Sequence, residues 1–130
     1  MNHIYVVIAV DTVGALAANT LQGFVYLVDT NNYLGSWQEG TSQLHTVCQD
    51  SQIIVWTARA IDASNQADIQ SFSGSMVSRS ICTPQLSITQ GDGAWAGRVE
   101  TQGAFGSFPY TISLALGSKM LSFNAFLKVV

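Results

Sequence analysis

The chain has 130 residues and a net charge of −3, with 48% hydrophobic and only 10% charged residues. This length predicts one domain, residues 1–130, with a core of its own. The five cations are scattered along the sequence, which argues against a nucleic-acid partner. No apolar run approaches the roughly 18 residues that span a bilayer.

The opening segment, residues 2–20, can be read as an export signal or as the first strand of the fold. A signal needs a cationic start, but no Lys or Arg precedes Arg59. Asp11 also closes the apolar run at residues 4–10. That run is rich in aromatic and β-branched residues, which suit a strand. We therefore expect residues 4–10 to stay in the folded protein as a strand, followed by a turn or short helix over TVGALAAN.

The remaining apolar segments alternate with a period of two and are bounded by turn residues, which is typical of strands. QGDGAW is the clearest hairpin signal, because Asp-Gly suits tight primed turns. This spacing, without a long helical period, predicts an all-β fold, namely an antiparallel β-sandwich of about eight to nine short strands. The segments are 23–29, 42–48, 52–60, 67–77, 84–89, 94–100, 109–116 and 120–130.

Residues with catalytic chemistry are sparse. The only histidines are His3 and His45, and no G-x-S-x-G elbow accompanies them, so a hydrolase triad is not indicated. Cys48 and Cys82 lie in different strand segments and outside any zinc-type spacing, so a zinc site is not indicated. We expect two partly buried free thiols, with a disulfide between them as the alternative. The sequence predicts a protein that is not an enzyme and that uses no cofactor.

The polar loop at residues 29–40 is the best candidate for a binding site. Its spacing does not match a calcium loop, and turn chemistry explains its Asp and Asn residues as well as ligand binding does. The alternative is a carbohydrate platform, because an aromatic face beside amide groups suits a polar ring. The candidate ligand-binding residues are Asp29, Asn31, Asn32, Tyr33 and Trp37.

Two tryptophans, Trp56 and Trp95, lie inside strand patterns, and we expect both to be core residues. Arg59 follows Trp56 by three positions. Since successive side chains of a strand alternate between faces, these two residues should lie on opposite faces of their strand.

Several blocks, in order, give the chain a resemblance to a known family. They are VVIAVDT, FVYLVDTNNYLGS, LHTVCQDSQIIVWTARAID, WAGRVE and YTISLALGSKMLSFNAFLKVV. In this order they resemble the bacterial inclusion body protein family of the PixA/AidA type. The chain departs from the family at residues 123–126, which read Phe-Asn-Ala-Phe where members have Phe-Asp-Pro-Phe. It also lacks the proline-rich insertion after the first strand.

This resemblance implies a small bacterial β-rich protein that is made in the cytoplasm, accumulates in inclusions and acts in host interaction. The scarcity of charge independently predicts self-association as a homodimer or larger closed oligomer. Lys119 and Lys128 lie in the last strand segment, and we expect them to protect that segment as an edge. A lectin-like carbohydrate-binding sandwich is the alternative function.

Overall fold

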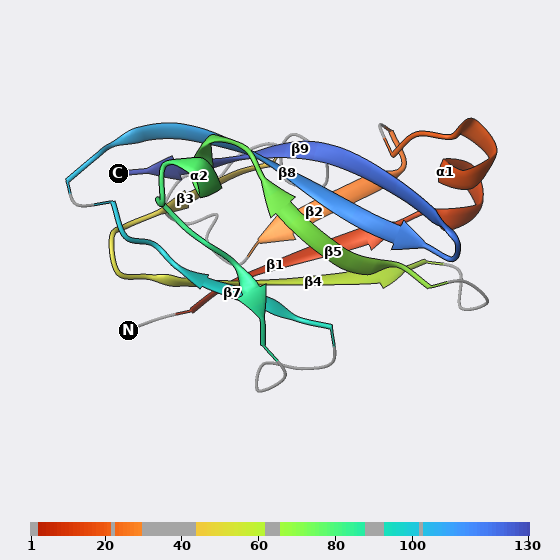
Figure 1. Cartoon of the computed structure of the whole chain (residues 1–130), viewed down its shortest axis with the longest axis horizontal. Helices are drawn as coiled ribbons and strands as arrows, with labels where there is room; N and C mark the ends of the chain where they lie inside the picture. The colour runs from red at the N-terminus through yellow and green to blue at the C-terminus, as the bar shows by residue number, and fades with distance from the viewer. Residues whose placement is uncertain (1–2, 22, 30–43, 62–65, 88–92, 102) are drawn as a thin grey trace.

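Two β-sheets pack face to face in this computed structural model (Figure 1). The structure describes residues 3–21, 23–29, 44–61, 66–87, 93–101 and 103–130. Within these residues the order of elements is β1 (His3–Val10), α1 (Thr12–Ala18), β2 (Val25–Asp29), β3 (His45–Cys48), β4 (Ile53–Ala60), β5 (Asp68–Ser73), α2 (Ser75–Ser78), β6 (Gln85–Leu86), β7 (Trp95–Arg98), β8 (Gly106–Leu116) and β9 (Lys119–Val129).

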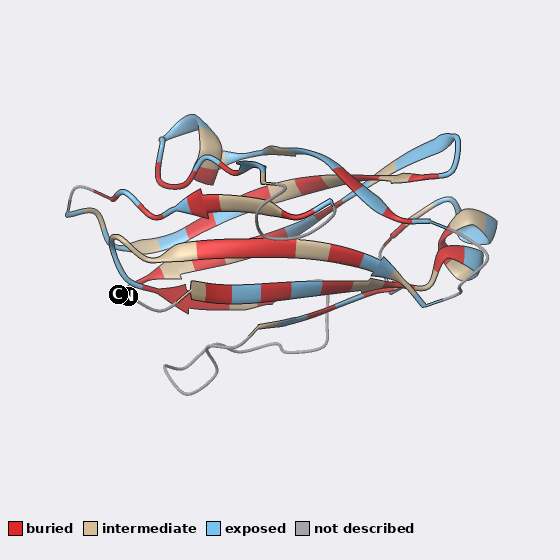
Figure 2. Cartoon of the chain, turned by 90° about the horizontal axis from the view of Figure 1, so that it is seen from below, coloured by how far each residue is buried: buried red, intermediate tan, exposed pale blue. Residues whose placement is uncertain are grey.

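The five-stranded sheet has the order β2-β1-β4-β7-β6, and the four-stranded sheet has the order β3-β9-β8-β5. Figure 2 shows the two layers from the side, with buried and exposed residues alternating along the strands. Buried apolar side chains from the inner faces of both sheets form one core. The predicted all-β sandwich of about nine strands is therefore confirmed.

The sheets are mixed, so the prediction of a purely antiparallel sandwich was wrong. β1 pairs in parallel with β4 along its whole length, from His3 opposite Ile53 to Val10 opposite Ala60. β3 pairs in parallel with β9. A period of two in the sequence tells which side chains share a face, but it does not tell which strands become neighbours. Here the chain changes sheets between β2 and β3 and again before β4.

The opening segment forms the expected strand, and of the turn or short helix expected after it the structure has the helix. Along β1, buried residues alternate with more exposed ones. Asp11, which ends the apolar run, is the N-cap of α1, and its side chain accepts a hydrogen bond from Gly14 N at 3.1 Å. Asn19 ends the helix in the left-handed conformation, with φ of 57°, which Asn tolerates better than most residues. The carboxylate that follows the strand therefore caps the first turn of the helix.

β8 and β9 form a long hairpin whose turn is Gly117-Ser118, with Leu116 opposite Lys119. Gly117 has φ of 65°, as the first position of a tight hairpin turn requires. β3 pairs with β9 only from Phe126 to Val129, so Lys128 lies in a paired part of the strand, and the prediction that it protects an edge was wrong. Among the described residues no strand pairs with that side of β9 near Lys119. The predicted strand at 67–77 ends at Ser73, because residues 75–78 form α2.

Candidate functional site

Of the five candidate ligand-binding residues, only Asp29 lies in the described part of the chain; Asn31, Asn32, Tyr33 and Trp37 lie outside it. Asp29 ends β2, and one of its carboxylate oxygens accepts a hydrogen bond from Thr46 Oγ1 at 2.7 Å. Thr46 is fully buried in β3. Since β2 and β3 are edge strands of different sheets, this bond joins the two sheets along one side of the sandwich.

An aromatic cluster fills the core between the sheets. Trp56 is fully buried, and its Nε1 donates to the hydroxyl of Tyr110 at 3.3 Å. The ring centroid of Phe72 lies 4.9 Å from that of Trp56 and 5.5 Å from that of Trp95. Burial raises the pKa of Tyr110 well above its usual range, so its hydroxyl stays protonated at neutral pH. This cluster is structural.

The two tryptophans differ in environment. Trp56 is a core residue, as predicted, and Arg59 is exposed on the opposite face of β4. Trp95 packs against the core but is only half-buried. Among the described residues its buried Nε1 has no hydrogen-bond partner, which leaves a donor uncompensated. The prediction that Trp95 is a core residue is therefore confirmed only in part.

Both cysteines are buried and carry free thiols. Burial raises the pKa of Cys48 and of Cys82 to about 12. For Cys82, the charges of Cys48 and Glu100 add smaller contributions in the same direction. Because the thiolate is the reactive form, burial and the raised pKa disfavour both residues as nucleophiles at neutral pH.

A shallow hollow of about 300 Å³ lies where the turn before β4 meets the end of β7. Its lining residues are Asp50, Ser51, Arg98, Val99 and Glu100. One carboxylate oxygen of Asp50 accepts hydrogen bonds from Thr101 N at 2.7 Å and Thr101 Oγ1 at 3.2 Å. The described residues include no group of three or more His, Cys, Asp and Glu side chains that could hold a metal ion. The two hydrogen bonds from Thr101 to Asp50 therefore hold the turn before β4 against the end of β7.

His45 lies on the outer face of β3 and stacks on Phe126 of β9, with ring centroids 4.3 Å apart. This stacking accounts for the position of the histidine without a catalytic role. Neither helix in the described ranges is long and apolar enough to cross a membrane.

The outer face of the four-stranded sheet is lined with hydroxyl groups. Thr111 Oγ1 donates to Asn124 Oδ1 at 2.6 Å, and the hydroxyls of Ser113 and Ser122 lie 2.8 Å apart. Ser73 and Ser71 of β5 lie opposite Thr111 and Ser113 and continue these two rows. The middle of this face is therefore polar, as the outer face of a sandwich normally is, although Met120 is exposed near one end of it.

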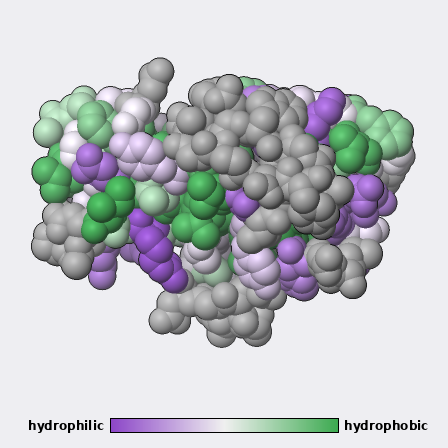
Figure 3. Space-filling model, turned by 180° about the vertical axis from the view of Figure 1, so that it is seen from behind, coloured by the Kyte–Doolittle hydropathy of each residue, from purple (hydrophilic) through white to green (hydrophobic). Residues whose placement is uncertain are grey.

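The outer face of the five-stranded sheet is different, because apolar side chains are exposed side by side on β1 and β2. Tyr5 is 45% exposed, Val7 39%, Tyr26 42% and Val28 45%. Val7 lies directly opposite Val28 in the β1–β2 register. We call these four residues the Tyr-Val patch. Figure 3, which views the molecule from behind, shows hydrophobic side chains in the middle of this face.

The Tyr-Val patch was missed in the sequence, although a signal for it exists. Tyr-x-Val occurs at residues 5–7 and again at residues 26–28. Both strands are apolar at nearly every position, so the sequence alone does not show which residues face the core. Only the pairing of β1 with β2 reveals that the two repeats form one surface.

Comparisons with known proteins support the fold. The crystal structure of inclusion body protein PixA from Burkholderia cenocepacia is similar, with a TM-score of 0.77 and 13% identity, over 99% of this chain and 96% of that chain. This confirms the expected likeness to an inclusion body protein at the level of the fold. No curated protein matches the chain. The family described as a domain of unknown function, DUF8788, matches residues 2–121, and the chain therefore belongs to that family.

Proposed function

We propose that this chain is a non-enzymatic protein of the inclusion-body type that works by associating with copies of itself. The Tyr-Val patch carries this proposal. Its side chains are 39–45% exposed, and removing apolar surface from water contributes about 25 cal/mol per Å². With 10% charged residues in the chain, little electrostatic repulsion opposes that burial.

Two further observations support this proposal. The fold is similar to that of a protein named as an inclusion body protein, and the sequence blocks noted above resemble the PixA/AidA type. Both cysteines are free and buried, which is the usual state of thiols in a reducing compartment. We therefore propose accumulation in the cytoplasm, with a role in host interaction as the family resemblance implies.

Light scattering coupled to size exclusion tests self-association. We expect a mass of at least two chains at micromolar concentration, falling towards 13.9 kDa on dilution. Because the association is driven by apolar burial, raising the salt concentration should not dissociate it. A mass of one chain at every concentration, in both low and high salt, would refute the proposal.

A further inference from the structure

We propose that the outer face of the five-stranded sheet binds the same face of a second copy, with the Tyr-Val patch at the centre of the contact. This inference rests on the proposed self-association and adds the surface and the geometry. The two copies would be related by a two-fold axis that lies in the plane between the stacked sheets, the commonest closed arrangement.

The patch has a local two-fold symmetry of its own. β1 and β2 are antiparallel, and Val7 lies opposite Val28. Rotation about an axis through the midpoint of this pair, normal to the sheet, brings Val7 onto Val28 and Tyr5 onto Tyr26. An extended peptide would meet the same side chains in either direction, so the patch would not select one direction for it. A second copy that binds about a two-fold axis does not require the patch to select a strand direction.

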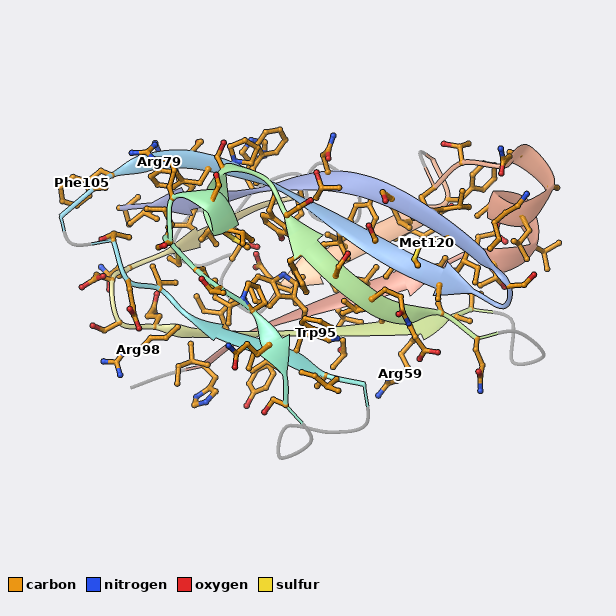
Figure 4. All side chains as sticks on the ribbon, viewed as in Figure 1. Arg59, Arg79, Trp95, Arg98, Phe105 and Met120 are labelled. Carbon is orange, nitrogen blue, oxygen red and sulfur yellow. The ribbon has the colours of Figure 1, made fainter. Side chains whose placement is uncertain are left out.

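Charge also favours a second copy over a charged partner. The described strands of this sheet carry two charged side chains on the outer face, Arg59 and Arg98, and Figure 4 shows them at separate places along the sheet. Arg98 lies opposite Ile53, which is six residues from Arg59, or on the order of 20 Å along β4. The centre of the face is uncharged, and the net charge of −3 disfavours an anionic lipid surface.

The strand pattern indicates that this face is built to be covered. Strands that are buried on both faces are apolar at nearly every position, whereas a solvated face shows polar residues at alternate positions. β1 reads HIYVVIAV, so three of its four outer positions, Tyr5, Val7 and Ala9, carry aromatic or aliphatic side chains, and the fourth is His3. On the four-stranded sheet, by contrast, the outer positions of β8 and β9 include Thr111, Ser113, Ser122 and Asn124.

The exposed area of the patch can be compared with the area that a stable interface buries. Since full burial of an aromatic side chain removes about 150–250 Å², Tyr5 and Tyr26 still expose roughly 60–110 Å² each. A stable interface buries about 800 Å² per partner. The patch alone is too small, so the contact must extend over its half-buried neighbours on the same face, which are His3, Ala9, Ile53, Thr57 and Ala96.

Charge placed in the patch tests the surface. We expect Val28→Lys and Tyr26→Lys each to weaken self-association at least tenfold, because a lysine would then be buried in an apolar contact. The matched control is Ser122→Lys, an exposed position in β9 on the opposite outer face, which should associate like the parent. Circular dichroism of each variant checks that the fold is retained.

The possible outcomes distinguish an error in the proposed surface from an error in the proposed function. If both patch variants are folded and associate as tightly as the parent, the surface is wrong while self-association stands. If the parent itself is monomeric, the proposed function fails and this inference fails with it. A monomeric parent that cosediments with vesicles of phosphatidylcholine and phosphatidylglycerol would assign the face to a lipid surface and overturn the proposal.

Discussion

Trp56 and Tyr110 are joined across the sandwich by a hydrogen bond of 3.3 Å from the indole Nε1 to the phenol oxygen. Trp56 belongs to β4 in one sheet and Tyr110 to β8 in the other. The two rings also meet edge to face, with centroids 5.9 Å apart. One pair therefore combines apolar burial with the only polar contact that the deeply buried indole makes among the described residues.

Removing the phenol oxygen should leave that indole donor unsatisfied. We expect Tyr110→Phe to lower the free energy of unfolding by about 1–3 kcal/mol. The control is Tyr26→Phe, since Tyr26 is 42% exposed and its change should stay within about 0.5 kcal/mol. Urea denaturation of the parent and the two variants measures both changes in the free energy of unfolding. Equal midpoints for Tyr110→Phe and the parent would show that the bond is not formed.

The two tryptophans should differ when each is truncated. Trp56→Ala should lower the free energy of unfolding by about 3–5 kcal/mol, because it opens a cavity in the core. Trp95→Ala should lower it by less, since Trp95 is half-buried and its Nε1 is unsatisfied within the described structure. Guanidinium denaturation followed by circular dichroism ranks the two variants. The reverse order would mean that Trp95, and not Trp56, anchors the core.

Asp29 should act on stability rather than on ligand binding. Asp29→Ala leaves the buried hydroxyl of Thr46 without this acceptor, and we expect a loss of about 1–3 kcal/mol. Asp68→Ala, at an exposed position in β5, is the control and should change stability by less than about 0.5 kcal/mol. A glycan array on the parent and Asp29→Ala checks the alternative. Sugar binding at millimolar or tighter affinity that is lost in Asp29→Ala would favour the lectin function.

The buried thiols predict a fall in stability at alkaline pH. Above pH 9 the thiols ionise in the unfolded chain, while the raised pKa of about 12 keeps Cys48 and Cys82 protonated in the native state. The unfolded state then binds fewer protons, so the free energy of unfolding decreases by up to about 1.4 kcal/mol per pH unit for each thiol. Urea titrations between pH 8 and pH 11 measure this slope.

A double variant tests whether the thiols cause this decrease of the free energy of unfolding with pH. Combining Cys48→Ala with Cys82→Ala should make the decrease smaller. The remaining decrease would include the contribution of Tyr110, whose pKa is also raised by burial. An unchanged slope in the double variant would show that the thiols are already accessible to solvent in the native protein.

The sequence predicts the strands well because strand formation depends on local alternation and turn residues. β1 and β4 occupy the expected segments, and the segment after Val10, expected as a turn or short helix, is a helix that begins at the Asp11 cap. The parallel pairings of β1 with β4 and of β3 with β9 could not be predicted in this way. They depend on how the chain crosses between sheets, which the period of each segment does not encode.

The candidate surface was harder to predict than the fold. Tyr5 and Val6 are both apolar, yet Tyr5 is 45% exposed and Val6 is fully buried. In a strand that is apolar on both faces, only the packing of the opposite sheet determines which residues face the core. The loop at residues 29–40 was predicted as a binding site because its polar residues are concentrated in sequence. Asp29 instead bonds Thr46 between the sheets.

Cross-linking tests most directly whether the outer face of the five-stranded sheet binds a second copy. Stacked sheets lie about 10 Å apart, and a two-fold contact centred on the patch brings Val7 over Val7 or Val28 of the second copy. The native thiols are buried, so a short bis-maleimide should react only with introduced cysteines. We predict a covalent dimer from Val7→Cys, Val28→Cys or their mixture, and none from Ser122→Cys. Dimer formation from Ser122→Cys alone, with none from the patch variants, would contradict the account.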